Sequence, residues 1–266
     1  MSVRAKCVSR RRFIAFVLIG LSFVLLAGCG SGSISPSGPP TLRVLTYNIH
    51  HGEGADEVFD YERLARVIDS LSPDIVALQE VDVGTERASG VDQAEKLGKL
   101  CGMPHAFGQA MPYQGGQYGE AILSRFPIQK TAVHPLPYQV GQEPRAALEV
   151  RIEPEGIGPV IFVGTHLCHQ SEENRIQQTR RISELFPTDE GGPAILAGDF
   201  NARPGSQPMS VLLQNGWIDA VAPKSRIDYV LIRRRDPWRI KAVVILDEPV
   251  ASDHDPVLVV LEWQGD

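Results

Sequence analysis

Short apolar stretches and longer amphipathic stretches alternate along the chain from residue 41 onward. Residues 42–48 alternate apolar and polar positions as a strand does, and residues 61–71 repeat apolar positions at the spacing of an amphipathic helix. The same patterns predict further strands at residues 75–78, 119–124, 128–136, 146–152, 160–165, 194–197, 227–232, 240–246 and 257–261, and further helices at residues 91–100 and 172–185. No repeat or second linker interrupts the series, so we expect one domain over residues 41–264.

The order of these elements indicates the class of the fold. Residues 119–165 contain four predicted strands in succession with no helix between them, which argues against a purely parallel sheet. Elsewhere, strands alternate with helices. We therefore expect an α/β domain built as a four-layer sandwich, in which two mixed β-sheets face each other and helices cover their outer faces.

The first 28 residues have the pattern of an export signal. Five basic residues and no acidic residue precede an apolar run over residues 13–27. As a helix, this run would extend about 22 Å, short of the ~30 Å hydrocarbon core, so a permanent membrane span is the less favoured alternative. Arg10, Arg11 and Arg12 also resemble a twin-arginine export signal.

A cysteine preceded by Leu, Ala and Gly closes this segment at Cys29. The pattern resembles a bacterial lipobox, which implies that Cys29 is lipidated and becomes the new N-terminus; an ordinary cleavage site is the alternative. Beyond it, residues 30–40 contain only Gly, Ser and Pro besides one Ile, which is typical of a flexible tether. We therefore predict a signal peptide over residues 1–28, a lipid anchor and linker over residues 29–40, and a location at the membrane of the cell envelope, outside the cytoplasm.

Composition adds an argument from charge. The chain of 266 residues has a formal net charge of −6, with 43% hydrophobic and 22% charged residues, which is typical of a globular protein. Five of its 26 basic residues precede the apolar run whereas all 32 acidic residues follow it, so the remaining chain is strongly acidic. Such a domain gains little from counterion release, so nucleic acid is an allowed but not a favoured partner. Four cysteines in 266 residues are too few for a disulfide scaffold, and the absence of a CxxC pair gives no indication of a zinc site. Cys101 and Cys168 could be paired or free.

Side chains suited to catalysis stand beside the ends of six predicted strands. They are Asn48, Glu80, His166, Asp199 with Asn201, Asp228, and Asp253 with His254. One such residue is typical of a turn, but six at the same kind of position indicate a shared rim. Glu80, Asn48 and Asp253 offer hard oxygen ligands, which suit Mg²⁺ or Mn²⁺. Since the chain has no serine or cysteine nucleophile motif, P-loop or dinucleotide fingerprint, the set favours metal-assisted attack of water on phosphorus.

The order of these motifs resembles the endonuclease/exonuclease/phosphatase superfamily. The motifs are TYNIH at residues 46–50, LQE at 78–80, GTHL at 164–167, GDFN at 198–201, RIDYVL at 226–231 and SDHDPV at 252–257. The resemblance covers about residues 42–262. It implies a deoxyribonuclease I-like fold and a Mg²⁺- or Mn²⁺-dependent hydrolase that acts on phosphate esters.

The resemblance also implies a role for each residue around the metal. Glu80 is expected to be the main metal ligand, and Asn48 and Asp253 to complete the site directly or through water. His254 is expected to be the catalytic histidine, with Asp228 as the carboxylate that orients it. Some relatives carry a carboxylate at the position of His50, and this chain lacks that possible ligand for a second metal ion. Whether the site holds one metal ion or two therefore stays open.

The same resemblance assigns the groups that handle water and phosphate. Asp199 and Asn201 align the attacking water or assist the leaving oxygen, and either Asp199 or His254 removes the proton. His166 is expected to donate a hydrogen bond to the phosphoryl oxygens.

Further residues are candidates for contact with the substrate phosphate. Arg145 stands where several relatives have such a contact, and Glu120 stands where many relatives have asparagine. Arg87 is a third candidate, with a solvated loop residue as the alternative. Two histidines beside prolines, His105 and His134, are expected in loops.

The substrate is less defined than the reaction. A surface anchor and an acidic domain favour esters outside the cytoplasm, such as lipid head groups, sugar phosphates or nucleotides. One alternative is a secreted or surface endonuclease, and an alternative of another class is a binding module without catalysis. We expect a monomer.

Overall fold

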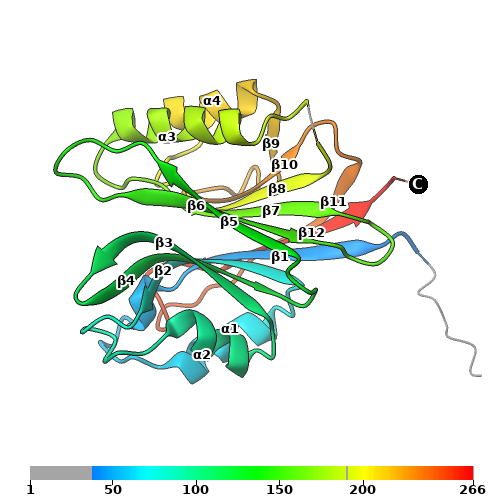
Figure 1. The fold of residues 1–266 in the computed structure, drawn as a ribbon. Helices are drawn as coiled ribbons and strands as arrows, with labels where there is room; N and C mark the ends of the chain where they lie inside the picture. The colour runs from blue at the N-terminus through cyan, green and yellow to red at the C-terminus, as the bar shows by residue number, and fades with distance from the viewer. Residues whose placement is uncertain (1–37, 190, 266) are drawn as a thin grey trace, which may run out of the picture. The chain divides into compact units, whose positions relative to one another are not determined.

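The computed structural model describes residues 38–189 and 191–265, which form two six-stranded β-sheets packed face to face (Figure 1). The predicted signal peptide and Cys29, the predicted site of lipidation, lie outside the described residues. Within the described ranges, no helix is both long and apolar enough to cross a bilayer.

The two sheets have related layouts. The first consists of β1 (Thr41–Asn48), β2 (Ile75–Val83), β3 (His105–Tyr113), β4 (Gly116–Ser124), β11 (Trp238–Ile245) and β12 (Val257–Trp263), in the order β11-β12-β1-β2-β4-β3. The second consists of β5 (Lys130–Leu136), β6 (Arg145–Ile152), β7 (Val160–His166), β8 (Ala194–Asp199), β9 (Trp217–Asp219) and β10 (Asp228–Arg233), in the order β5-β6-β7-β8-β10-β9. The two central strands of each sheet are parallel, β1 with β2 and β7 with β8, and the other pairs are antiparallel.

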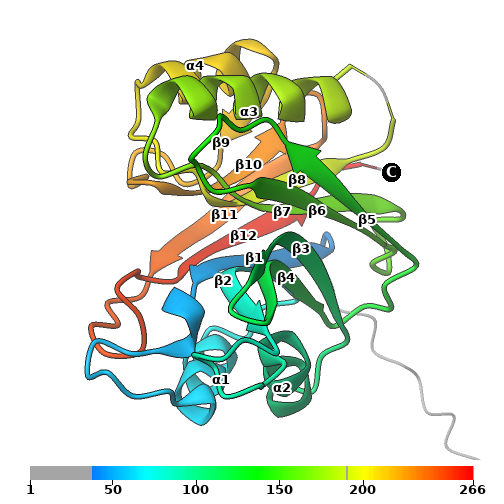
Figure 2. The same ribbon diagram turned by 60° about the vertical axis from the view of Figure 1, so that its left-hand side comes forward.

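Helices connect the parallel strands and cover the outer faces of the sheets. The helices are α1 (Tyr61–Ser70), α2 (Gln93–Leu100), α3 (Glu172–Leu185) and α4 (Gln207–Gln214), with a short 3₁₀ helix η1 (His50–Gly52). α1 joins β1 to β2 and α3 joins β7 to β8, as parallel strands require a crossover. Figure 2 shows α1 and α2 on one side of the paired sheets and α3 and α4 on the other. The predicted sandwich of two mixed sheets flanked by helices is therefore confirmed.

Three apolar layers hold this arrangement together. Val44, Phe162 and Val259 belong to the layer between the sheets. A second layer packs α1 and α2 against the first sheet, and a third packs α3 and α4 against the second. Side chains cap the starts of α1, α2 and α3: at α1, for example, the side chain of Asp60 accepts from the backbone N–H of Arg63.

Several local predictions were incomplete or wrong. β3, α4 and the three-residue β9 were not predicted. His105 begins β3, so placing it in a loop was wrong. His134 lies inside β5, which agrees with the predicted strand over residues 128–136 and contradicts its separate placement in a loop. Both strands stand at the edge of their sheets, where a proline within the strand is tolerated because its missing N–H faces outward. Cys101 and Cys168 are free cysteines.

Candidate active site

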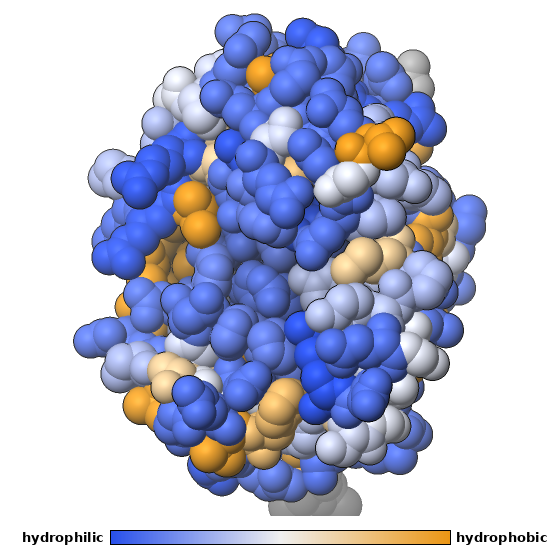
Figure 3. Space-filling model, turned by 90° about the vertical axis from the view of Figure 1, so that its left-hand side faces the viewer, coloured by the Kyte–Doolittle hydropathy of each residue, from blue (hydrophilic) through white to orange (hydrophobic). Residues whose placement is uncertain are grey.

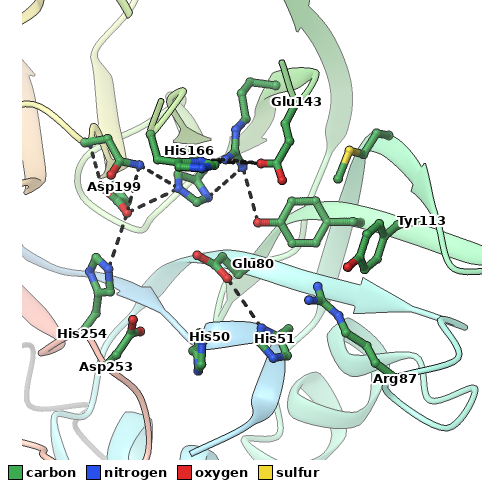
Figure 4. Close-up of a pocket in the computed structure, with 15 residues that line it drawn as sticks. His50, His51, Glu80, Arg87, Tyr113, Glu143, His166, Asp199, Asp253 and His254 are labelled. Carbon is green, nitrogen blue, oxygen red and sulfur yellow. Dashed lines mark hydrogen bonds and ion pairs between the residues drawn. The ribbon is translucent and has the colours of Figure 1, made fainter. Parts of the chain in front are cut away.

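A cavity of about 320 Å³ opens at the edge of the domain where the central strands of both sheets end. Figure 3 shows a hollow among hydrophilic residues on this face. The cavity is lined by His50, His51, Glu80, Arg87, Met111, Tyr113, Tyr118, Glu143, Arg145, His166, His169, Asp199, Asn201, Asp253 and His254 (Figure 4). Most of the residues selected from the sequence therefore meet in one place, although they come from both sheets.

Glu80 reaches the cavity through an irregularity in β2 rather than from a strand end. The pairing of β2 with β4 shifts register between Leu78 and Val81, and Glu80 has a left-handed φ of 59°. A β-bulge of this kind re-aims one side chain without ending the strand. The prediction that Glu80 follows the end of its strand was wrong, because β2 continues to Val83.

Asn48 lies fully buried beneath the cavity and joins the two sheets. Its Nδ2 donates to Glu80 Oε1 at 3.0 Å and to Asp199 Oδ2 at 3.3 Å, while its Oδ1 accepts from the backbone N–H of His50 at 3.0 Å. The amide oxygen accepts one hydrogen bond inside the chain and keeps a second lone pair. In this arrangement Asn48 positions two carboxylates.

Glu80 is held in its charged form. Burial alone would raise the pKa of Glu80, but its polar contacts with His51 and Asn48 outweigh burial and hold the pKa below its ordinary value. Glu80, an ionised and mostly buried carboxylate, lines the same cavity as Asp253, and two such carboxylates are a donor set that fits a hard divalent cation. Geometry alone singles out a different group within the described residues: Asp199, Asp228 and His254 offer ligand atoms within 4.8 Å of one another.

His254 and Asp228 form a pair across the two sheets. His254 Nδ1 lies 3.2 Å and 3.1 Å from the two carboxylate oxygens of Asp228, and its Nε2 lies 3.7 Å from Asp199 Oδ2. Burial alone would lower the pKa of His254, but the hydrogen bond and charge of Asp228 and the charge of Asp199 raise it to about 9. Burial and the nearby Asp228 raise the pKa of Asp199. His254 is therefore a cation at neutral pH, and Asp199 is a stronger base than a solvated carboxylate.

His166 is neutral, and polar side chains contact both of its ring nitrogens. Arg145 Nη1 lies 3.1 Å from His166 Nδ1, while His166 Nε2 lies 3.0 Å from Asn201 Nδ2 and 3.4 Å from Asp199 Oδ2. Burial, followed by the charge of Arg145, lowers the pKa of His166. His166 is therefore an uncharged residue of the cavity wall that Arg145 and Asn201 hold in place.

The two arginines of the cavity are anchored by protein partners. Besides His166, the Arg145 side chain contacts Tyr118 Oη, Glu143 and His169, so it orients His166 as well as facing the cavity. Arg87 donates to both oxygens of the fully buried Asp82 and lies over the ring of Tyr113 at 4.6 Å. Arg87 is therefore a fixed part of the cavity wall and not a solvated loop residue.

Glu120 does not join the others at the cavity. It is 1% exposed, neither carboxylate oxygen has a hydrogen-bond partner, and burial raises its pKa to about 8. It lies behind the wall, where its neutral form avoids the cost of a buried charge.

Three residues that line the cavity, Met111, Tyr113 and Glu143, were not predicted from the sequence. Met111 and Tyr113 belong to β3, which was not predicted, and Glu143 follows an exposed loop. Apolar and polar positions alternate only weakly over residues 105–113 (HAFGQAMPY), so the sequence did not indicate that this segment forms a strand at the cavity.

Comparisons with known proteins agree with this geometry. The sequence profile of the Endonuclease/Exonuclease/phosphatase family matches residues 45–254. The uncharacterized protein YbhP of Escherichia coli strain K12 is 31% identical over 170 residues, which cover 60% of this chain and 67% of YbhP. An endonuclease/exonuclease/phosphatase from Beutenbergia cavernae superposes with a TM-score of 0.71 at 27% identity, covering 85% of this chain and 72% of that chain. A mannosyl-6-phosphatase from Bacteroides thetaiotaomicron superposes with a TM-score of 0.66 at 20% identity, covering 84% of this chain and 100% of that chain, a likeness of fold alone.

Proposed function

Because the chain belongs to the endonuclease/exonuclease/phosphatase family, we propose that it is a divalent-cation-dependent hydrolase that cleaves a phosphate ester by direct attack of water. Members of this superfamily are hydrolases of phosphate esters. The observation that carries the proposal is the meeting of Glu80, His166, Asp199 and His254 in one cavity, with Asp228 behind His254.

Each polar group has a task in this reaction. Asp199, with its raised pKa, accepts the proton of the attacking water. His254, kept cationic by Asp228, donates to the phosphoryl or leaving oxygen as negative charge develops there. His166, held in place by Arg145 and Asn201, forms a second hydrogen bond with the phosphoryl group.

The metal-binding part of the proposal rests on two carboxylates. Glu80 and Asp253 would hold a divalent cation, Mg²⁺ or Mn²⁺, with Asn48 fixing the position of Glu80. When bound, such an ion polarises a phosphoryl oxygen as a Lewis acid.

The activity is tested on bis-p-nitrophenyl phosphate with Mg²⁺ and with Mn²⁺. Glu80→Ala and His254→Ala should each lower the rate at least about 100-fold, the effect of one positioned acid or base. His134→Ala is the matched control. His134 lies on the edge strand β5, outside the cavity, and its ring contacts Glu149 on the neighbouring strand β6. Absence of turnover in folded protein would favour a binding module without catalysis, and near-normal rates in either alanine variant would contradict the assigned roles.

We further propose a substrate outside the cytoplasm, reached by a monomer anchored through a lipid on Cys29. A cavity of about 320 Å³ has the size of a small-molecule site, which suits a lipid head group, a sugar phosphate or a nucleotide better than duplex DNA. A screen of these esters and of nucleic acid with Mg²⁺ and Mn²⁺ identifies the class. Mass spectrometry of the mature N-terminus tests the anchor, and an unmodified residue there would refute it.

A further inference from the structure

One side of the cavity has no task in the reaction proposed above. Figure 4 shows Arg87, Tyr113 and Glu143 on this side, which we call the distal side, and His254 across the cavity from them. The cavity of about 320 Å³ has the size of a site that encloses a whole small molecule. When the catalytic residues hold the phosphate group, the distal side is therefore open to the alcohol to which the phosphate is esterified.

Arg87 brings a hydrogen-bond donor to the distal side without adding net charge. Its Nε and Nη2 donate to the two carboxylate oxygens of Asp82 at 2.6 and 2.9 Å, and Asp82 is fully buried. A bidentate pair of this kind balances the charge of the guanidinium and fixes its plane. Among the described residues, the third guanidinium nitrogen, Nη1, makes no hydrogen bond. Nη1 is therefore available to an oxygen atom of a ligand.

Two tyrosines and a methionine surround this guanidinium with apolar surface. Arg87 Cζ lies 4.6 Å from the centre of the Tyr113 ring and 5.6 Å from the centre of the Tyr118 ring, and such cation–π contacts restrict its movement. Met111 precedes Tyr113 by two residues on β3, so both side chains are on the same face of the strand. Both line the cavity and are partly exposed. The distal side thus combines a fixed N–H donor with a surface that suits the carbon–hydrogen face of a ring.

Glu143 contributes a hydrogen-bond acceptor and a negative charge. Its Oε2 accepts from Arg145 Nη2 at 2.7 Å, so the charge of Arg145 is balanced as well. The Glu143 side chain is 40% exposed, and its Oε1 has no hydrogen-bond partner among the described residues. The two arginines and the carboxylates of Asp82 and Glu143 therefore sum to no net charge. An anionic group bound here would lie beside a carboxylate, and contact between like charges is strongly unfavourable.

We propose that the distal side binds the alcohol portion of the substrate, and that it selects an uncharged alcohol rich in hydroxyl groups over one that carries a second phosphate. The proposal rests on the function proposed above and defines its substrate class. Arg87 Nη1 donates to one hydroxyl group of the alcohol, and Glu143 Oε1 accepts from another. Sugars and nucleosides share this chemistry, and turnover of one against the other distinguishes them.

The test compares fructose 6-phosphate with fructose 1,6-bisphosphate, which differ by one phosphate group. With the full chain and Mg²⁺, kcat/KM for the monophosphate should exceed that for the bisphosphate at least about tenfold, because the second phosphate meets Glu143. Glu143→Lys reverses this charge and should lower the ratio at least about tenfold. Glu153→Lys is the matched control: Glu153 is exposed, lies outside the cavity and follows the opposite end of β6 from Glu143, so the ratio should not change.

Arg87→Lys supplies an independent variant, since lysine keeps a cation beside Asp82 but lacks the planar guanidinium and its Nη1. This variant should raise KM for fructose 6-phosphate at least about threefold, and by a larger factor than it lowers kcat, as expected when a binding contact made equally in the ground state and the transition state is lost.

Equal kcat/KM for the two fructose esters in the wild type, or an unchanged ratio in Glu143→Lys, would overturn the proposal. Faster turnover of adenosine 5′-monophosphate than of fructose 6-phosphate would support it and identify the alcohol as a nucleoside. Turnover of bis-p-nitrophenyl phosphate without turnover of any of these three esters would overturn the proposal and leave the hydrolase standing. Absence of turnover of every ester would contradict the hydrolase and this proposal with it.

Discussion

At the scale of single residues, two histidines in the same cavity have opposite charge states. His254 contacts two carboxylates and its pKa is raised to about 9, whereas His166 contacts a guanidinium and is buried, which lowers its pKa. Burial and the partner of each ring together set the difference, because His166 is the more deeply buried ring and lies against a guanidinium, whereas His254 lies against carboxylates. His254 is suited to stabilise developing negative charge, and His166 to form a hydrogen bond without charge.

The charge of His254 leads to a prediction for the pH dependence of catalysis. If cationic His254 is the active form, kcat/KM falls on the alkaline side as the pH rises through the His254 pKa of about 9. On the acid side, kcat/KM falls as Asp199, the proposed base with a raised pKa, becomes protonated. Asp228→Asn removes the charge that raises this pKa, so the alkaline limb of the profile should move to lower pH. A rate that instead rises through pH 9 would make His254 the general base.

The sequence indicated which residues belong to the candidate site, but it did not indicate which side chains they contact. His254, Asp228 and His166 were selected because each stands beside a predicted strand. Nothing in the sequence indicates that Arg145 contacts His166, or that Asn48 directs its amide hydrogens at two carboxylates, because these contacts depend on side-chain orientation in the folded state.

At the scale of elements, the parallel strands β7 and β8 position two catalytic groups side by side. His166 and Asp199 are register partners at the ends of these strands. One residue earlier, Thr165 pairs with Gly198, and a Cβ on Gly198 would lie 1.9 Å from the backbone oxygen of Thr165. Only glycine therefore permits the close approach that aligns the strand ends.

Gly198→Ala should accordingly destabilise the protein by about 2 kcal/mol or more, within the range for forced overpacking, and should also reduce activity. Gly164→Ala on the neighbouring strand is the control, since its Cβ would meet Ile122 at an ordinary contact distance of 3.4 Å. Urea unfolding of both variants measures the difference. Equal stability of the two would show that the backbone relaxes at position 198.

Most helices and strands were predicted because their apolar positions repeat regularly. The elements that were not predicted have a weak repeat. Buried central strands read as apolar runs, whereas β3 is an edge strand containing Gly108 and Pro112. In α4, Pro208 stands in the first turn, a position helices accept but which sequence patterns also associate with loops. The bulge at Glu80 was not predictable, because it depends on pairing with β4.

At the scale of the whole domain, each sheet supplies half of the cavity. Glu80 and His254 come from the first sheet or its loops, and His166 and Asp199 come from the second. Bonds between Asn48 and Asp199 and between His254 and Asp228 join the halves. A ligand bound at the cavity contacts both sheets and should stabilise their association.

Metal binding should therefore raise the stability of the folded domain. At a free Mn²⁺ concentration of 100 times the Kd, the free energy of unfolding should increase by about 2.7 kcal/mol, provided the unfolded chain does not bind the ion. Thermal unfolding with Mn²⁺ and after its removal by EDTA measures the effect. Glu80→Gln should abolish the increase, and an equal increase in that variant would place the ion elsewhere.

The division of the cavity between two sheets also has a consequence for how this protein can evolve. The distance between the halves depends on the apolar layer that contains Val44 and Phe162, far along the strands from any polar group of the cavity. A methyl group gained or lost in that layer changes the alignment of His254 with Asp228 while every reacting side chain is retained. Lineages that share all the polar residues can therefore diverge in rate through changes of interior volume alone.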